Sequence, residues 1–280
     1  MQGAILRDSY LDLRHYPHYA PLPNLETFAN AGFPFTRLAD LRETTVVLPA
    51  VPTEQEIETF VTLMGHFSRQ TGFPTLRVTV TGADALKSGS PTDFLIIGTG
   101  DDQPAFDKLN NQLPVALHSG SVQVHDTQGF FAPLHHAWWK LETGEHTESG
   151  DLTAGGTPDA VIEGIKSPYG PAGDRSIVAI HLKDAASFEP FMATFIKVQQ
   201  SSAVSLSVSV LHGTQFQSFR IGSDVYHVGV LPWWTQTSMW FREHPYVASV
   251  VMFILTLLLA VWVRLWLRAK ARSRLRMSQD

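Results

Sequence analysis

Hydrophobic and polar positions change their spacing along the chain, and each spacing predicts a different kind of element. Residues 44–48 are β-branched and apolar, which is typical of a buried strand. A segment with helical spacing follows, and Thr53 and Glu56 in front of it have the spacing of a capping box. We therefore expect a helix that begins after Thr53 and ends at Gly72. Its expected inward face consists of Ile57, Phe60, Val61 and Met64.

Further apolar segments predict more strands and a second long helix. The strands are expected at residues 76–80, 93–97, 177–181, 205–211, 215–221 and 225–230, and the helix at 187–199. Strand, helix and strand alternate in the first part of this series, which favours right-handed crossovers. The pattern therefore predicts an α/β fold: a mainly parallel sheet with helices on both faces.

The beginning of the chain lacks this regularity. Residues 16–23 contain too many prolines for a helix or a strand, whereas residues 25–30 suggest one helical turn. We assign residues 1–43 to a lead-in segment and linker from an upstream module, and residues 44–231 to the sheet domain.

An uncharged apolar run near the end predicts a transmembrane helix. Residues 246–263 carry no charge and would rise roughly 27 Å as a helix, close to a hydrocarbon core of about 30 Å. With Leu265, Trp266 and Leu267 the expected span covers residues 245–267. Six cations follow the run: Arg264, Arg268, Lys270, Arg272, Arg274 and Arg276. The positive-inside rule then places residues 268–280 in the cytoplasm and the bulk of the chain on the other side of the membrane.

Aromatic residues directly before this run predict an amphipathic helix at residues 232–244. Trp233, Trp234, Thr237, Trp240 and Phe241 stand at offsets of 0, 1, 4, 7 and 8, which is one face of a helix. We expect this helix to lie in the headgroup layer, with its indoles in the aromatic belt, and the His244-Pro245 step to bend the chain. The candidate docking residues are thus Trp233, Trp234, Trp240 and Phe241, and the candidate cytoplasmic basic anchor is Arg264, Arg268, Lys270 and Arg272.

This topology requires export of the sheet domain. Residues 1–8 have neither a cationic start nor an apolar run of signal-peptide length. We therefore expect the chain to be the C-terminal portion of a longer exported precursor. The chain has no cysteine, which suits an oxidising compartment without disulfides but also suits the cytosol.

Composition narrows the classes of function. Apolar residues make up 44% and charged residues 17%, which predicts folded cores. The net charge of −5 includes the basic tail, so the exported part is more acidic, which argues against a nucleic-acid-binding surface.

The chemistry-bearing motifs are weak. The sequence GTGDD at residues 98–102 follows a predicted strand, where doubly wound sheets bind ligands, but it has only two glycines of a dinucleotide fingerprint. Asp101 and Asp102 would repel a phosphate, and no partner for them as an acid–base pair or metal ligands stands nearby. The adjacent His135 and His136 would point apart and make a poor metal clamp. We therefore expect no catalytic, cofactor or metal site.

Several proline- and aromatic-rich strings carry a family resemblance. They are YLDL at 10–13, YPHY at 16–19, LPNL at 22–25, FANAGFPFTR at 28–37, ADL at 39–41, MGHF at 64–67 and TGFP at 71–74. These strings, together with the order of sheet domain, interfacial helix, single span and basic tail, resemble the periplasmic regulatory B subunit of bacterial cellulose synthase.

The resemblance implies a fold and a set of partners. In that family two carbohydrate-binding jelly rolls alternate with two flavodoxin-like domains, and this chain would hold the last flavodoxin-like domain, the interfacial helix and the anchor. The implied function is that of a non-catalytic subunit in the cell inner membrane, which the catalytic cellulose synthase subunit needs for cyclic di-GMP-activated synthesis. The implied partners are that catalytic subunit, the lipid bilayer and the nascent β-1,4-glucan guided through the periplasm.

Two points qualify what the resemblance implies. The family is labelled cyclic di-GMP-binding, but this nucleotide is cytosolic, so we expect its action to be indirect. Two alternatives stay open: a flavin- or nucleotide-binding membrane-anchored α/β enzyme, suggested by the doubly wound sheet, and a stand-alone sugar-binding module.

Overall fold

The computed structural model describes residues 19–118, 121–124, 156–170, 175–198, 203–221, 226–229, 231–243 and 245–276. The chain divides into two compact units. One runs from Ala20 to Gly229, and the other combines Met1–Tyr19 with Val230–Asp280.

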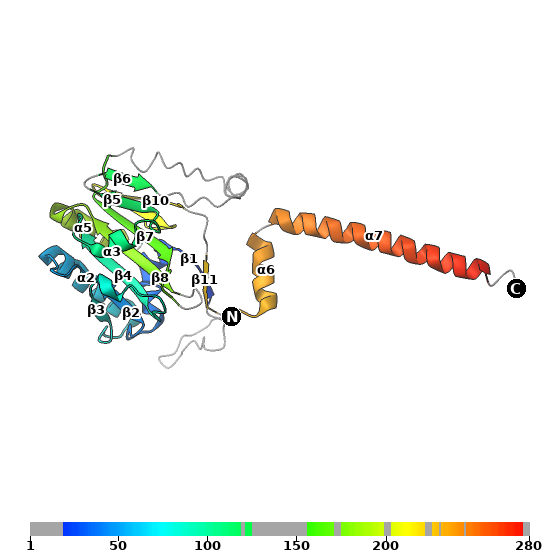
Figure 1. Ribbon diagram of the computed structural model, residues 1–280, viewed down its shortest axis with the longest axis horizontal. Coiled ribbons are helices and arrows are strands. Elements are labelled where there is room, and N and C mark those ends of the chain that lie inside the picture. Colours follow the sequence, from blue (N-terminus) through cyan, green and yellow to red (C-terminus); the bar gives the residue numbers. More distant parts are fainter. Residues whose placement is uncertain are drawn as a thin grey trace, which may run out of the picture. The chain divides into compact units, whose positions relative to one another are not determined.

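The first unit is built on a seven-stranded sheet (Figure 1). Its strands are β2 (Thr44–Val47), β3 (Thr79–Thr81), β4 (Asp93–Thr99), β7 (Ala160–Lys166), β8 (Ser176–Leu182), β9 (Val208–His212) and β10 (Gln215–Phe219), in the order β10-β9-β7-β8-β4-β2-β3. The pairs β2–β3, β2–β4 and β4–β8 are parallel. The pairs β7–β8, β7–β9 and β9–β10 are antiparallel.

The sheet is therefore mixed, which corrects the expectation of a mainly parallel one. β9 and β10 form a hairpin that turns at Gly213 (φ +60°), and a tight hairpin can join only antiparallel strands. β7, a strand that the sequence analysis did not predict, lies between β8 and β9 and is antiparallel to both.

One face of the sheet is covered by three helices and a phenylalanine cluster. The helices are α1 (Leu25–Ala31), α2 (Glu54–Thr71) and α5 (Phe188–Val198), with the short 3₁₀ turns η1 (Phe35–Arg37) and η5 (Ala185–Ser187). Phe28 lies at the centre, with ring centroids 5.9 Å from Phe35, 6.1 Å from Phe67 and 6.0 Å from Phe195. Residues 20–43, which the sequence suggested as a linker, thus contribute α1 and η1 to this core.

Helix α2 confirms the predicted ends and half of the predicted inward face. Thr53 and Glu56 form the capping box, and Gly72 closes the helix in the left-handed conformation (φ 67°). The buried apolar residues are Leu63, Met64 and Phe67, whereas Ile57 and Val61 are 46% and 57% exposed. The prediction holds for Met64 and for Phe60, which packs on the core, and is wrong for Ile57 and Val61, because the buried face also takes in the polar Glu56 and Thr59.

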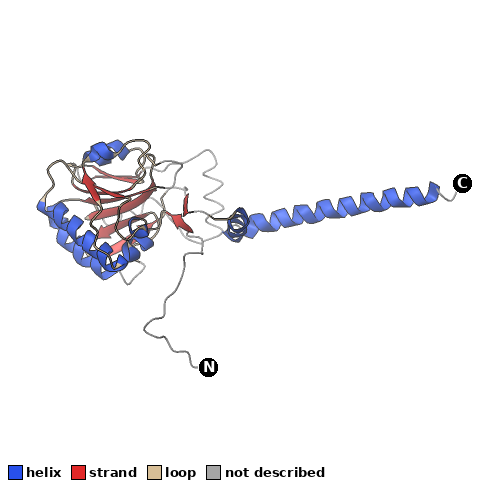
Figure 2. Cartoon of the chain, turned by 90° about the horizontal axis from the view of Figure 1, so that it is seen from below, coloured by secondary structure: helices blue, strands red, loops and turns tan. Residues whose placement is uncertain are grey.

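The opposite face is covered by α3 (Pro104–Leu109), the turn η2 (Ala83–Ala85) and the hairpin of β5 (Val115–His118) and β6 (Ser121–Val124). Phe106 and Leu109 of α3 pack with Phe94 and Ile96 of β4. Val115 of β5 packs in a separate cluster with side chains of β7 and β9. Helices therefore lie on both sides of the strands, as expected (Figure 2).

A second, two-stranded sheet joins the beginning and the end of this unit. It pairs β1 (Tyr19–Leu22) with β11 (Tyr226–Gly229). Leu22, Tyr226 and Val228 form a small cluster against which Phe33 packs. Residues 19–22 correct the expectation that the proline-rich stretch contains no strand. A short strand with one neighbour tolerates a proline, because the backbone on its other edge needs no N–H donor.

The second unit contains two helices, α6 (Trp233–Glu243) and α7 (Pro245–Arg276). Within α7, residues Val247–Arg268 are long and apolar enough to cross a membrane, by length and composition.

Candidate membrane-docking site

Helix α6 begins where the sequence predicts it. The backbone N–H groups of Thr235 and Gln236 donate to the carbonyl of Pro232, at 2.9 Å and 3.1 Å, and the Thr237 hydroxyl donates to the Trp234 carbonyl. The missing N–H of Pro232 costs nothing at this position, since the first N–H groups of a helix have no intrahelical acceptor.

The aromatic side chains of α6 are largely exposed. Trp233 is 73% and Trp234 61% exposed, and their rings meet edge to face with centroids 6.1 Å apart. Phe241, two turns further on, is 40% exposed. The side chain of Trp240 lies outside the described residues, as do those of Lys270 and Arg272. Large exposed indoles are uncommon on a protein surface in water and typical of a membrane interface or a partner contact.

Helices α6 and α7 are separate, because α6 ends at Glu243 and α7 begins at Pro245. The predicted bend at the His244-Pro245 step falls on His244, which lies outside the described residues. Two hydroxyl groups in the first half of α7 donate to backbone carbonyls of the same helix. The Ser249 hydroxyl donates to the Pro245 carbonyl, and the Thr256 hydroxyl donates to the Met252 carbonyl.

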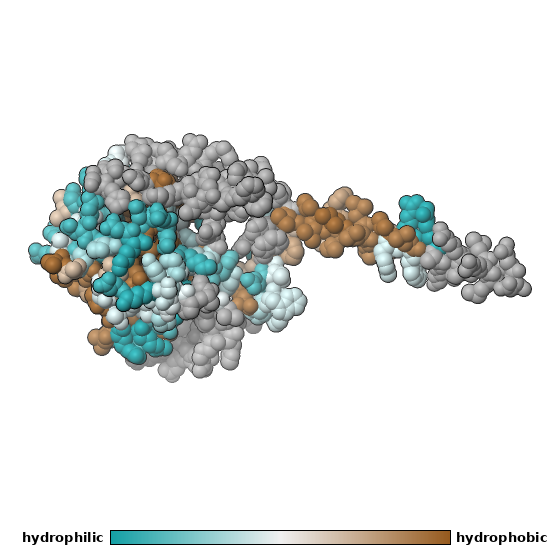
Figure 3. All heavy atoms as spheres, in the orientation of Figure 1, coloured by the Kyte–Doolittle hydropathy of each residue, from teal (hydrophilic) through white to brown (hydrophobic). Residues whose placement is uncertain are grey.

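The apolar surface of α7 continues without charge up to Arg264, and Figure 3 shows it as an unbroken hydrophobic stretch. Arg264 and Arg268 follow one turn apart, and both side chains are exposed. Together, α6 and α7 present an aromatic helix, an apolar helix and a cationic end in chain order. This is the arrangement of a single-span anchor with an interfacial helix.

The carboxyl end of the parallel strands, where doubly wound sheets bind ligands, holds a side chain of the protein itself. Glu56 is 1% exposed, and its two carboxylate oxygens accept the backbone N–H groups of Thr53 (2.7 Å) and Thr99 (2.9 Å). A phosphate at this position would meet a buried carboxylate instead of free N–H groups. Sequence analysis identified Glu56 as a cap but not its bond to Thr99, 43 residues away.

The glycine motif at the same edge is a packed turn. A Cβ on Gly98 would lie 2.5 Å from Cβ of Gln103 and 2.8 Å from Cε2 of Phe106. Gln103 caps the short helix α3 and donates to the carbonyls of Ile97 (2.8 Å) and Val47 (3.3 Å). The close approach at Gly98 is thus filled by protein atoms, and these residues do not fit a flavin phosphate or a nucleotide.

Two buried carboxylates elsewhere bind the protein's own groups. Asp93, at the start of β4, accepts from Arg37 (2.8 Å) and from the backbone N–H of Ser176 (2.8 Å), and Arg175 lies at 3.4 Å. Burial raises the pKa of Asp93, and Arg37 opposes this rise. Glu163 of β7 accepts the N–H of Val115 (3.0 Å), and burial raises its pKa to about 8.

Both carboxylates thus accept hydrogen bonds from the protein's own groups. Over the described part of the chain, no group of three or more His, Asp or Glu side chains could hold a metal. His135 and His136 lie outside the described residues. The exposed aromatic and cationic side chains of α6 and α7 therefore remain the candidate functional site.

Comparison with known families agrees with the strings found in the sequence. Residues 18–180 match the family described as the second FD domain of the cellulose synthase protein BcsB, and this is more than half of the chain. The chain belongs to the BcsB family.

Individual relatives extend the similarity to α6 and α7. The chain is 35% identical to the cyclic di-GMP-binding protein of Escherichia coli K12 over 273 residues, and 32% identical to that of Xanthomonas axonopodis pv. citri over 290 residues, with 98% of this chain covered in both. It is also 32% identical to cellulose synthase 2 of Novacetimonas hansenii over 275 residues, which cover 96% of this chain. The chain spans only 34%, 35% and 17% of these three BcsB-like relatives, respectively.

Proposed function

We propose that this BcsB chain is a non-catalytic, membrane-anchored regulatory subunit of a bacterial cellulose synthase. In this proposal a flavodoxin-like domain is held at the membrane by α6 and α7, which dock on the catalytic subunit. The observation that carries the proposal is the exposed Trp233–Trp234 pair on a helix directly before the apolar span, in a chain of this family.

The flavodoxin-like assignment is supported by strand order. The parallel strands run β3-β2-β4-β8, and in chain order within this set that is 2-1-3-4, the order of flavodoxin-like sheets. The position that a fifth parallel strand would take is occupied by the antiparallel β7. The proposed domain is therefore a flavodoxin-like half extended by an antiparallel half.

The proposed topology follows from charge. Six cations between Arg264 and Arg276 favour a cytoplasmic C-terminus, so the sheet domain would be periplasmic and the protein a single-pass component of the inner membrane. A sheet domain tethered in this way would stand beside the exit of the catalytic subunit, where the nascent β-1,4-glucan emerges, and would guide it.

Cyclic di-GMP enters this proposal indirectly. Five relatives share the name cyclic di-GMP-binding protein, but a cytosolic nucleotide would meet only the basic tail of this chain. The Glu56 carboxylate at the ligand edge of the sheet also argues against a phosphate site in the domain. The nucleotide would therefore act on the catalytic subunit, which needs this chain as its partner.

The test is glucan synthesis by the full chain co-reconstituted with a catalytic cellulose synthase subunit, in the presence of UDP-glucose and cyclic di-GMP. The Trp233→Ala/Trp234→Ala variant should reduce synthesis at least tenfold, because the aromatic surface that docks α6 is lost. Gln236→Ala/Ser238→Ala changes two exposed polar residues of the same helix and should leave synthesis unchanged. Undiminished synthesis by the tryptophan variant would reject the proposal.

The rival function, a flavin- or nucleotide-binding enzyme, makes a different prediction. It requires a coloured protein or a thermal shift on addition of FMN or a nucleotide. We expect neither, because Glu56 and Gln103 already fill the ligand edge.

A further inference from the structure

The cationic end of α7 has no counter-ion within its own helix. Arg264 is the first charged residue after Glu243, and from residue 244 to residue 279 the sequence contains no aspartate or glutamate. Neighbouring side chains on α7 therefore cannot neutralise Arg264 or Arg268 by the usual pairing of residues three or four apart. Their counter-charge has to come from a molecule outside the helix.

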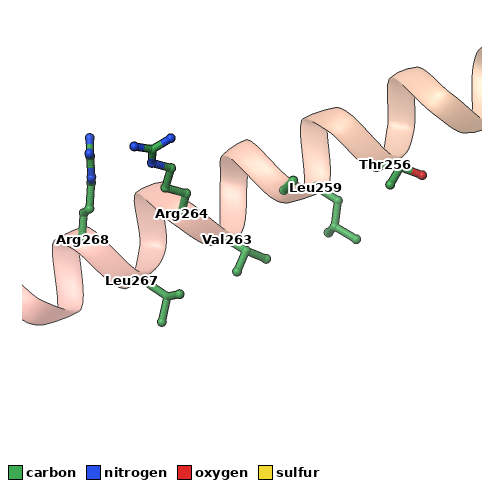
Figure 4. Close-up of a pocket in the computed structure, with 7 residues that line it drawn as sticks. Thr256, Leu259, Val263, Arg264, Leu267 and Arg268 are labelled. Carbon is green, nitrogen blue, oxygen red and sulfur yellow. The ribbon is translucent and has the colours of Figure 1, made fainter.

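Arg264 and Arg268 lie on one cationic face of α7, at the membrane end of a row that Arg272 continues by its spacing. Four residues apart, they lie about 40° from each other around the helix axis, with Cβ atoms roughly 6 Å apart. Figure 4 shows their guanidinium groups extending to the same side of α7, while Val263 and Leu267 point to the other side.

A second group of side chains marks the depth of this face in the membrane. Trp262 and Trp266 are 63% and 51% exposed and lie about 160° from Arg264, on the opposite side of the helix. Tryptophan on one side and arginine on the other, at the end of the apolar segment Val247–Arg268, fix this turn at the level of the headgroups.

We propose that Arg264 and Arg268 together bind the phosphate of one anionic phospholipid, of the phosphatidylglycerol class. Guanidinium groups bind phosphate oxygens through two parallel N–H bonds, and two of them one turn apart can hold a single phosphodiester from both sides. An anionic lipid is selected because a zwitterionic headgroup carries its own cation, which two arginines would repel. The apolar residues beside the pair, Ala260, Val263 and Leu267, would contact the acyl chains.

This inference rests on the membrane insertion of α7, which the proposed function also assumes, but it does not involve the catalytic subunit. It can therefore be tested on the purified full chain alone. The chain in neutral detergent is mixed with equal amounts of phosphatidylglycerol and phosphatidylcholine of matched acyl chains, and the lipids retained are counted by native mass spectrometry. We expect phosphatidylglycerol to be retained about tenfold more often than phosphatidylcholine.

The variants separate a site from diffuse attraction. Arg264→Gln/Arg268→Gln should reduce the preference to below threefold. Lys270→Gln/Arg274→Gln removes the same charge from positions about 120° and 80° around the helix from Arg264, away from the Arg268 side, and should keep most of the preference. Arg264→Lys/Arg268→Lys, which keeps the charge and the insertion of the helix but loses the planar fork, should give an intermediate value.

Three results would overturn the proposal. They are equal retention of both lipids by the native chain, an unchanged preference in Arg264→Gln/Arg268→Gln, and equal losses in the two glutamine variants. The first result would indicate that this face binds an acidic helix of a neighbouring protein instead of a lipid. The third would mean that the whole basic tail attracts anionic lipid without a specific site. Because no catalytic subunit is present, none of these results depends on whether the chain supports glucan synthesis.

Discussion

Thr99, at the end of β4, donates its backbone N–H to Oε1 of Glu56 in the first turn of α2, at 2.9 Å. The other carboxylate oxygen accepts the N–H of Thr53 at 2.7 Å. One side chain thus caps a helix and satisfies a strand end at the same time, and it does so where a doubly wound sheet usually leaves N–H groups for a ligand.

Removing this carboxylate should destabilise the sheet domain. In Glu56→Ala two part-buried N–H groups lose their acceptor, and we expect a loss of about 2–3 kcal/mol, or a lowering of Tm by roughly 4–12 °C. Thermal unfolding followed by near-ultraviolet circular dichroism measures it. Glu58→Ala, at an exposed position of the same helix, is the control and should leave Tm within about 2 °C. An equal Tm for the two variants would contradict the double role of Glu56.

Two glycines should respond oppositely to alanine. At Gly98 the new methyl group would press on Gln103 and Phe106, and we expect a loss of about 1–3 kcal/mol. At Gly65, inside α2, no atom lies within 4 Å of the added Cβ, so the better helix propensity of alanine should add about 0.5–1 kcal/mol. Urea unfolding of both variants measures the difference, and a stabilised Gly98→Ala would mean that the turn after β4 is not tightly packed.

Arg37 should contribute more to the stability of the sheet domain than Arg42, which is more exposed. Arg37→Ala leaves the buried Asp93 with Arg175 and the Ser176 N–H alone, and we expect a loss of about 2 kcal/mol. Arg42 bridges Asp40 at the surface, so Arg42→Ala should change the urea midpoint very little. Similar midpoints for the two variants would show that Asp93 does not depend on Arg37.

Glu163 should make stability fall as pH rises. Its folded pKa of about 8 lies above the ordinary 4.5, so the folded state binds more protons between these values. Its contribution to stability is therefore complete below about pH 4.5 and is lost as pH rises through about 8. Glu163→Gln should lack this contribution, so the native unfolding free energy minus that of the variant should fall as pH rises over about pH 5–8.5. The exposed Glu189→Gln is the control, and a slope that persists in Glu163→Gln would contradict the prediction.

Local signals in the sequence predicted local structure well. The ends of α2 were predicted because Thr53, Glu56 and Gly72 act within one turn of the helix end. The inward face of α2 was predicted only in part, because the burial of Glu56 depends on Thr99 at the end of β4. No signal within α2 could reveal a partner 43 residues away.

The antiparallel half of the sheet escaped sequence analysis for a similar reason. β7 reads AVIEGIK, and a glutamate followed by a glycine interrupts its apolar run. Glu163 is nevertheless buried, since Val115 of the β5–β6 hairpin covers it and supplies a donor. The proposed docking side chains of α6 and the arginines of α7 were assigned from sequence alone, because helical spacing puts them on shared faces.

The pairing of β1 with β11 has a mechanical consequence. The first and last strands of the sheet domain hydrogen-bond to each other, and the chain leaves the domain before Tyr19 and after Gly229. A pulling force between the preceding residues and the membrane helix would therefore load this short strand pair first. The seven-stranded sheet does not lie on that line of tension. Its packing would therefore stay intact until β1 and β11 separated.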